Sequence, residues 1–169
     1  MIIAGVDPGS RVTGYGIIRV EGNRFHCLEY GGINAVTRGD KTELKDRLNR
    51  VFDSLCALFE KYSPDYLVVE NVFYARNARS SLVLGHVRGV ILLAAARAAL
   101  PVVEYTPLEV KRAITGYGRA DKDQVQAMVR RLLGLDQLPQ PHDAADALAL
   151  ALCQGFGGSR SPKIGRAHV

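Results

Sequence analysis

Four acidic residues stand where a fold can bring their side chains together. Asp7 ends the apolar run "MIIAGVD", and Glu70 ends the apolar run "YLVVE". Asp143 and Asp146 lie at positions i and i+3 of "HDAADALAL", so a helix places both on one face. Carboxylates gathered at one edge of a sheet repel one another, and their pKa values rise unless cations lie between them. The four acids therefore predict a cation site.

Hard oxygen ligands of this kind suit Mg²⁺, which binds carboxylates together with the phosphate oxygens of a substrate. Two ions roughly 4 Å apart can activate a water molecule and stabilise the leaving 3′ oxygen of a phosphodiester. We therefore predict Mg²⁺-dependent phosphodiester hydrolysis with a two-ion site, in which Mn²⁺ can substitute. Structural alternatives stay open: Asp7 before Pro8-Gly9 as a turn former, and Asp143 as a helix cap or helix-dipole partner.

The segment that follows Glu70, "NVFYARNARSS", mixes aromatic residues with arginines. Aromatic rings stack on exposed bases and arginines bind backbone phosphates, a combination typical of nucleic-acid contacts. The segment "GYGRADK" is expected to be a loop whose backbone can approach phosphate. The candidate DNA contacts are Phe73, Tyr74, Arg76, Arg79, Arg119 and Lys122. Core packing remains the alternative for the aromatics, and a solvated surface remains the alternative for the arginines.

Composition limits the class of protein. The chain has 169 residues, 47% of them apolar and 23% charged, which suits one globular domain. A net charge of +5 mildly favours an anionic partner. Three cysteines without a CxxC pair predict reduced thiols and a cytoplasmic protein. No basic region precedes the first strand, so no signal peptide is expected, and the apolar run 90–96 is too short for a membrane span.

The order of apolar patterns predicts an α/β domain. Strands are expected at about 1–7, 15–20, 25–33, 66–70 and 101–105, and helices at about 40–62, 80–100, 108–114, 123–133 and 142–153. A meander followed by alternating helices and strands implies a mixed sheet with helices on both faces. One domain is expected over 1–154. A flexible basic tail is expected over 155–169, either native or partly of cloning origin.

The expected helix at 80–100 is apolar nearly all round, more than one sheet face can cover. Gly85 and Gly89 permit another helix to approach closely. Two roles stay open: a buried central helix, or a two-fold dimer interface. The candidate interface residues are Leu82, Gly85, His86 and Gly89.

Four blocks carry a family resemblance: "GVDPGSRVTGYG", "VVENVFYARNARSSLVLGHVRG", "VKRAITGYGRADKDQVQAMV" and "HDAADALALAL". In this order and spacing they resemble the RuvC family of bacterial Holliday-junction resolvases, from the first strand to about Cys153. The resemblance implies a ribonuclease-H-like fold with a five-stranded mixed sheet. It also implies a Mg²⁺-dependent homodimeric endonuclease that nicks two opposed strands of a four-way DNA junction and works with the RuvA–RuvB branch-migration complex.

The resemblance also implies roles for individual residues. The acids carried over as metal ligands are Asp7, Glu70, Asp143 and Asp146. Lys111 and Lys122 match basic positions that contact the phosphate at the cleavage site, and Phe73 matches an aromatic that stacks on bases near the crossover. Some relatives carry histidine at the Asp143 position, but the Asp-x-x-Asp spacing keeps Asp143 as the ligand. His142 is then a neighbour of the site that could still assist proton transfer.

Other functions remain to be separated from this one. A ribonuclease H acting on RNA–DNA hybrid would share the fold, and a junction-binding protein without cleavage would share the DNA surface. A phosphotransferase fits less well, because the chain offers no second phosphate-binding glycine loop.

Overall fold

A single mixed sheet of five strands forms the centre of the molecule, in the order β3-β2-β1-β4-β5. The computed structural model describes residues 1–34, 42–71 and 78–157. The strands are β1 (Ile2–Asp7), β2 (Val12–Glu21), β3 (Arg24–Asn34), β4 (Tyr66–Glu70) and β5 (Val102–Tyr105). Strands β1, β2 and β3 pair antiparallel, whereas β4 pairs parallel with both β1 and β5. The predicted five-stranded mixed sheet is confirmed.

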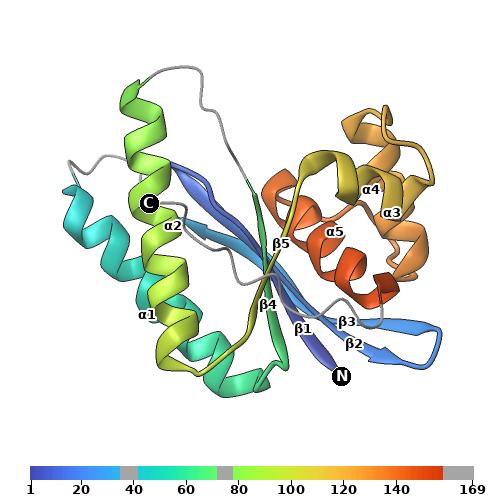
Figure 1. The fold of residues 1–169 in the computed structure, drawn as a ribbon, viewed down its shortest axis with the longest axis horizontal. Coiled ribbons are helices and arrows are strands. Elements are labelled where there is room, and N and C mark those ends of the chain that lie inside the picture. The colour runs from blue at the N-terminus through green and yellow to red at the C-terminus, as the bar shows by residue number, and fades with distance from the viewer. Residues whose placement is uncertain (35–41, 72–77, 158–169) are drawn as a thin grey trace.

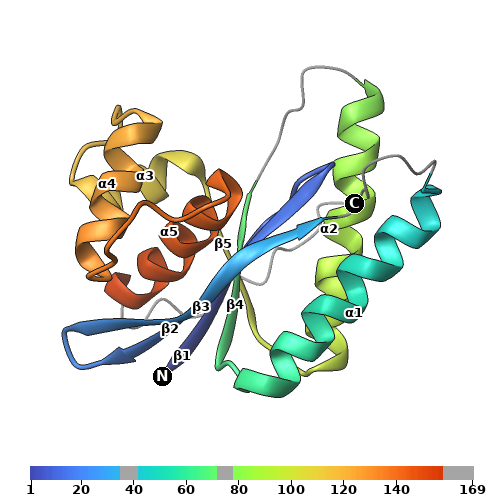
Figure 2. The same cartoon turned by 180° about the vertical axis from the view of Figure 1, so that it is seen from behind.

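Helices cover both faces of this sheet, as predicted (Figures 1 and 2). One layer contains α1 (Leu44–Tyr62) and α2 (Ala78–Arg97), which contact each other. The other layer contains α3 (Pro107–Thr115), α4 (Lys122–Leu132) and α5 (His142–Gly157).

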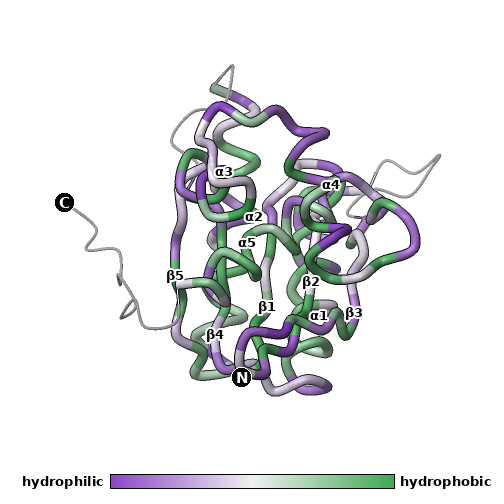
Figure 3. The backbone as a smooth tube through the Cα atoms, turned by 90° about the vertical axis from the view of Figure 1, so that its right-hand side faces the viewer, coloured by the Kyte–Doolittle hydropathy of each residue, from purple (hydrophilic) through white to green (hydrophobic). Residues whose placement is uncertain are grey.

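Alternating side chains of the strands divide the core between the two layers. Ile3 and Val68 pack toward α3, α4 and α5, whereas Ala4, Val6 and Val69 pack toward α1 and α2. This alternation follows from the two-residue period of a strand. Figure 3 shows hydrophobic segments gathered in the strands and α5, with hydrophilic segments concentrated in outer loops.

Local sequence signals explain where the helices begin and end. The apolar face predicted for 40–62 is buried at Val51, Leu55, Leu58 and Phe59, and α1 ends at Ser63, which adopts a left-handed conformation. Helices α3 and α4 each begin with a capping box, Thr106 with Glu109 and Asp121 with Gln124. A capping box satisfies backbone N–H groups that the first helical turn leaves free.

Several boundaries differ from the prediction by a few residues, and two of these differences have a local cause. Lys122 is the first residue of α4 rather than part of the preceding loop, because Asp121 accepts a hydrogen bond from the Gln124 N–H and starts the helix there. Helix α5 continues to Gly157, four residues beyond Cys153, where the helix was expected to end. Phe156, in the last turn of α5, packs edge-on against Phe25 of β3, and this contact holds the turn against the sheet. The rest of the predicted tail, 158–169, lies outside the described residues.

Helix α2 is longer and more apolar than the run 90–96 suggested. By length and composition alone it would suffice to cross a membrane, and 22% of its apolar window is buried inside the protein. In this fold it packs beside α1 on the sheet, with Val87, Ile91, Ala94 and Ala95 buried. Its other side is exposed.

Candidate active site

Asp7 and Glu70 end neighbouring parallel strands at the same edge of the sheet. The register pairs Val6 with Val69, so the next residues, Asp7 and Glu70, stand level with each other. Val6 and Val69 both face α1 and α2, and side chains alternate along a strand. Both carboxylates therefore point toward the α5 layer, on strands roughly 5 Å apart.

Close approach of α5 to the sheet brings the second pair of acids to this edge. A Cβ atom on Gly14 would lie 2.0 Å from the Asp143 carbonyl oxygen, and one on Gly5 would lie 2.0 Å from the Ala147 carbonyl oxygen. Only glycine leaves room for a helix backbone at these positions. Because Gly14 pairs with Asp7 across β1 and β2, the first turn of α5 lies directly beside Asp7.

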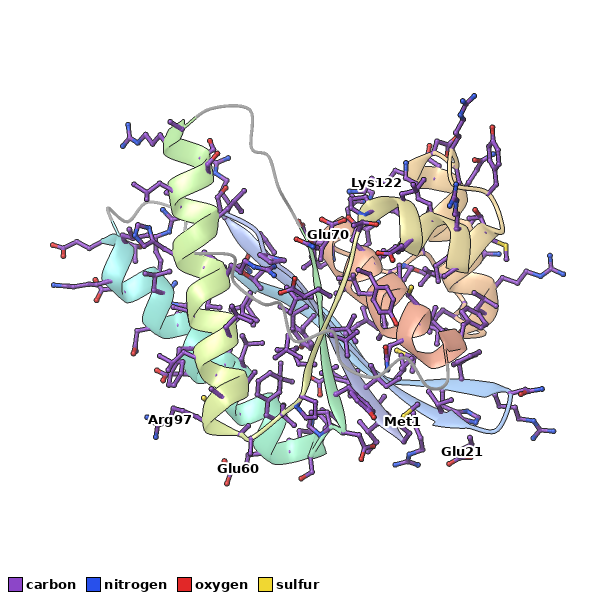
Figure 4. The ribbon with its side chains drawn as sticks, viewed as in Figure 1. Met1, Glu21, Glu60, Glu70, Arg97 and Lys122 are labelled. Atoms are coloured by element: carbon purple, nitrogen blue, oxygen red, sulfur yellow. The ribbon has the colours of Figure 1, made fainter. Side chains whose placement is uncertain are left out.

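A small cleft opens at this edge. Its lining combines three acids, two lysines and an apolar wall: Asp7, Glu70, Asp146, Lys111, Lys122, Pro107, Val110, Val125, Ala149 and Leu150. It holds about 90 Å³ of space for water-sized groups, which is room for several water molecules. Figure 4 shows Glu70 at the end of β4 and Lys122 at the start of α4, at the same end of the sheet.

The acids of this cleft strongly perturb one another. Burial first of all, and then the charges of Glu70, Asp146 and Asp143, raise the pKa of Asp7 to about 8, while the charge of Lys122 opposes them. Burial and the charge of Asp146 also raise the pKa of Glu70, against the effect of Lys122. Asp143 does not line the cleft, but its charge reaches Asp7. Such a cluster favours a bound cation.

Lys122 supplies a positive charge to this cluster. Its Nζ lies 2.8 Å from Oδ2 of Asp146, and this hydrogen bond raises the pKa of Lys122, with further contributions from Asp7 and Asp143. A lysine in the first turn of a helix opposes the helix dipole. The acid cluster, and not the dipole of α4, therefore stabilises the positive charge of Lys122.

Substitution of Lys122 with methionine is expected to lower the predicted phosphodiester cleavage by about 10²-fold, because the cluster loses a cation that can pair with a phosphate. The measurement is single-turnover cleavage of a labelled four-way junction. Arg130→Gln is the matched control, since Arg130 is exposed on the same helix as Lys122 and does not line the cleft. Equal losses in both variants would mean that only general surface charge matters.

The donor set fits a divalent cation, although its present arrangement is not a formed metal site. Within the part of the chain that the structure describes, no three His, Cys, Asp or Glu side chains lie close enough to hold an ion together. The charge of Lys122 acts on Asp7 and Glu70 and is paired with Asp146. Carboxylate oxygens are nevertheless the hard ligands that Mg²⁺ prefers. Here they are open to a cleft that has room for water, and their raised pKa values show that they lack a fully neutralising charge.

Other candidates fall into different places. His142 is exposed at the start of α5, and its Nδ1 lies 3.0 Å from the buried Gln126 amide nitrogen. Arg79 and Arg119 are exposed and do not line the cleft. Phe73, Tyr74 and Arg76 lie outside the described residues.

The candidate interface residues form one exposed stripe along α2. Leu82, Gly85, His86 and Gly89 are all exposed, and Leu82 is 63% exposed. A Cβ atom on Gly85 or Gly89 would meet nothing within 4 Å. At helical spacing the stripe continues through Leu92, Leu93 and Ala96, which sequence reasoning did not include.

Sequence reasoning also missed the residues that set the distance between α5 and the sheet. Gly5 and Gly14 stand in the first block, and their apolar strand context gave no indication of a helix lying over them. Their spacing from Asp7, together with the alanines of "HDAADALALAL", is the signal that could have predicted a close strand–helix contact.

The fold and the acid cluster define a ribonuclease-H-like nuclease class: a five-stranded mixed sheet whose first and fourth strands end in carboxylates beneath a helix. The model of the family "Crossover junction endodeoxyribonuclease RuvC" matches residues 3–154. The chain belongs to this RuvC family of crossover junction endodeoxyribonucleases.

Individual relatives agree along nearly the full chain. The RuvC of Desulforamulus reducens is 47% identical over 163 residues, covering 94% of this chain and 98% of the relative. That of Heliobacterium modesticaldum is 50% identical, covering 90% and 93%. RuvC of T. thermophilus, solved in complex with a Holliday junction substrate, matches with a TM-score of 0.83 and 31% identity, covering 94% of this chain and 95% of that one. The yeast mitochondrial resolvase Ydc2 shares only the fold, with a TM-score of 0.63 and 13% identity, covering 91% and 78%.

Proposed function

We propose that this protein resolves four-way DNA junctions by Mg²⁺-dependent hydrolysis of phosphodiester bonds, with symmetric paired nicks. The observation that carries the proposal is the level placement of Asp7 and Glu70 on neighbouring strands beside Asp146. The T. thermophilus relative solved with a Holliday junction supports the substrate class.

The ligands of the metal are proposed to be the four acids Asp7, Glu70, Asp143 and Asp146. When bound, Mg²⁺ supplies an activated water and neutralises charge on the phosphate. The protein's part is to hold the carboxylates at one edge through the β1–β4 register and the close packing of α5. Apolar residues such as Val110 and Val125 limit water in the cleft, which strengthens its electrostatic interactions.

The lysines of the cleft are proposed to bind the scissile phosphate. Lys111 and Lys122 line the cleft from α3 and α4, so a phosphate that enters it meets both ammonium groups. Binding would draw Lys122 from Asp146 and release that carboxylate for the metal. Arg79 and Arg119, together with Phe73, Tyr74 and Arg76, are proposed to contact the DNA around the cleft.

A two-fold dimer through the exposed stripe of α2 is proposed to place one active site at each of two equivalent strands. A four-way junction has approximate two-fold symmetry, and an isologous dimer matches it. The exposed leucines and the open glycines of the stripe supply an apolar surface that a second copy can cover. We further propose action with the RuvA–RuvB complex in the bacterial cytoplasm.

Substitution of Leu93 with aspartate is expected to shift the protein from dimer to monomer, because it buries a charge in the proposed interface. The measurement is molar mass by light scattering across a dilution series. Leu138→Asp is the matched control: Leu138 is 42% exposed and Leu93 is 54% exposed, but Leu138 lies in the segment between α4 and α5, away from α2. An unchanged dimer in Leu93→Asp would assign the interface elsewhere.

The function is tested by cleavage of a synthetic four-way junction mapped at nucleotide resolution. Paired symmetric nicks with Mg²⁺, and binding without nicks with Ca²⁺, are expected. An RNA–DNA hybrid of the same sequence separates this activity from that of a ribonuclease H. Cleavage of the hybrid alone, or binding of the junction without cleavage under any metal, would contradict the proposal.

A further inference from the structure

Arg88 connects α2 to the strand end that holds Glu70. It lies on α2, in the helix layer opposite the acid cleft, and it does not line that cleft. Its Nη1 donates a hydrogen bond of 2.7 Å to the backbone carbonyl of Glu70. Its Nη2 donates to the carboxylate of Glu104, with which it also forms an ion pair. Both charged side chains are mostly buried, at 23% and 22% exposed.

The two sides of the sheet explain this arrangement. Glu104 lies between Val103 and Tyr105, which pack toward α5, so its own side chain points toward α2. Glu70 has the reverse orientation, with its carboxylate in the cleft and its carbonyl within reach of Arg88. One guanidinium therefore holds β4 and β5 together from behind the active site.

The peptide group that follows Glu70 is fixed from two directions. Arg88 binds the carbonyl of Glu70, and the N–H of Asn71 donates a 2.8 Å hydrogen bond to the carbonyl of Tyr105. Rotation of this peptide would turn the Cα–Cβ bond of Glu70 and move its carboxylate. A charge-assisted hydrogen bond is about twice as strong as a neutral one, so Arg88 restrains this rotation effectively.

We propose that Arg88 is a positioning residue for Glu70, which acts across the sheet on the direction of that carboxylate. This inference rests on the proposed role of Glu70 as a metal ligand. Arg88 also stands on the helix whose exposed stripe is the proposed dimer surface. It thus forms a direct chemical connection between that helix and the acid cluster.

The alternative role of Arg88 is to attach α2 to β5 through Glu104 alone. Two variants separate the roles, because Glu104→Gln removes the ion pair and leaves the bond to the Glu70 carbonyl, whereas Arg88→Gln removes both. Arg88→Lys retains a positive charge for Glu104 but lacks the two-pronged guanidinium. It serves as the conservative variant where Arg88→Gln does not fold.

The experiment uses full-length variants and three readouts: thermal stability, Mn²⁺ binding by calorimetry, and single-turnover junction cleavage. Outer partners of metal ligands typically contribute 10–100-fold to metal affinity or activity. We expect Arg88→Gln to weaken Mn²⁺ binding and to slow cleavage by about 10–100-fold. Arg88→Lys should give a smaller loss, and Glu104→Gln should alter stability with less than about a threefold change in Mn²⁺ affinity.

Equal losses of Mn²⁺ affinity in Arg88→Gln and Glu104→Gln, or unchanged Mn²⁺ affinity in a folded Arg88 variant, would overturn the inference.

The same measurements in a Glu70→Gln background separate the positioning role of Arg88 from the proposed function. If Arg88 acts through Glu70, Arg88→Gln adds no further loss of Mn²⁺ affinity in that background. Normal cleavage and Mn²⁺ binding by Glu70→Gln alone would contradict the proposed function, and the positioning role with it. Loss in Glu70→Gln but none in the Arg88 variants would contradict the positioning role alone.

Discussion

Replacement of Asp7 by asparagine is expected to lower junction cleavage by about 10³-fold or more while junction binding is kept. Asp7 stands at the centre of the cluster, since the charges of Glu70, Asp143 and Asp146 all act on it. Removal of its charge deprives a divalent cation of one ligand and deprives the reacting phosphate of the charge stabilisation that depends on that ligand. Cleavage and gel-shift binding of the same junction measure the two effects separately.

The same substitution is expected to stabilise the protein in the absence of metal. The folded Asp7 carboxyl has a pKa of about 8, against an ordinary value of 3.8, so the folded state binds more protons between these pH values. Stability therefore falls as pH rises from about 4 to about 8 and levels off above that. One pKa unit corresponds to about 1.4 kcal/mol. If half of this pKa shift acts on stability, the free energy of unfolding falls by about 3 kcal/mol between these pH values.

Thermal unfolding in EDTA between pH 5 and pH 9 tests this prediction. The gain of Asp7→Asn over the unmodified protein should grow with pH, and Mg²⁺ should reverse the difference, because a cation stabilises the ionised carboxylates. Asp136→Asn, a change at an exposed acid before α5, is the control and should alter neither cleavage nor the pH profile. A variant at Asp7 that cuts junctions at the normal rate would remove Asp7 from the metal site.

Substitution of Gly14 with alanine should cause the second large loss, in both stability and cleavage. The new Cβ would stand 2.0 Å from the Asp143 carbonyl oxygen and 2.2 Å from its carbonyl carbon. The atoms that the new Cβ would meet belong to the helix backbone, which cannot move aside as a flexible side chain can. The first turn of α5 must therefore shift. Overpacking of this kind costs about 1–3 kcal/mol or more. A misplacement of about 1 Å at a catalytic group can cost 10²-fold in rate.

Gly16→Ala offers a graded comparison on the same strand and face. Its Cβ would first meet the Leu148 side chain, 2.6 Å from Cδ2, and a side chain can adjust more easily than a helix backbone. We expect a smaller loss of cleavage for Gly16→Ala than for Gly14→Ala at comparable loss of thermal stability. If both variants lose cleavage only in proportion to their stability, then the position of α5 has no separate effect on the site.

The sequence alone determined the elements and their order, with boundaries that the structure shifts by a few residues, as at the start of α4 and the end of α5. The apolar period of α1 and the short apolar runs of β1 and β4 are local patterns, and local patterns report secondary structure directly. The position of each acid at an element end, and the four blocks shared with the RuvC family, could likewise be read from the chain. The prediction from local pattern was wrong at one site residue. The segment "GYGRADK" was expected to be a loop, whereas Asp121 caps α4 and Lys122 is its first residue.

Only the tertiary structure decided how those elements meet. The β1–β4 register sets Asp7 level with Glu70, the glycine contacts set the depth of α5, and Lys122 finds Asp146 from a different helix. Arg88 reaches the Glu70 carbonyl across 18 residues of chain and from the opposite helix layer. Each of these contacts joins segments distant in sequence, and their geometry depends on how whole strands and helices pack rather than on the preference of any one residue.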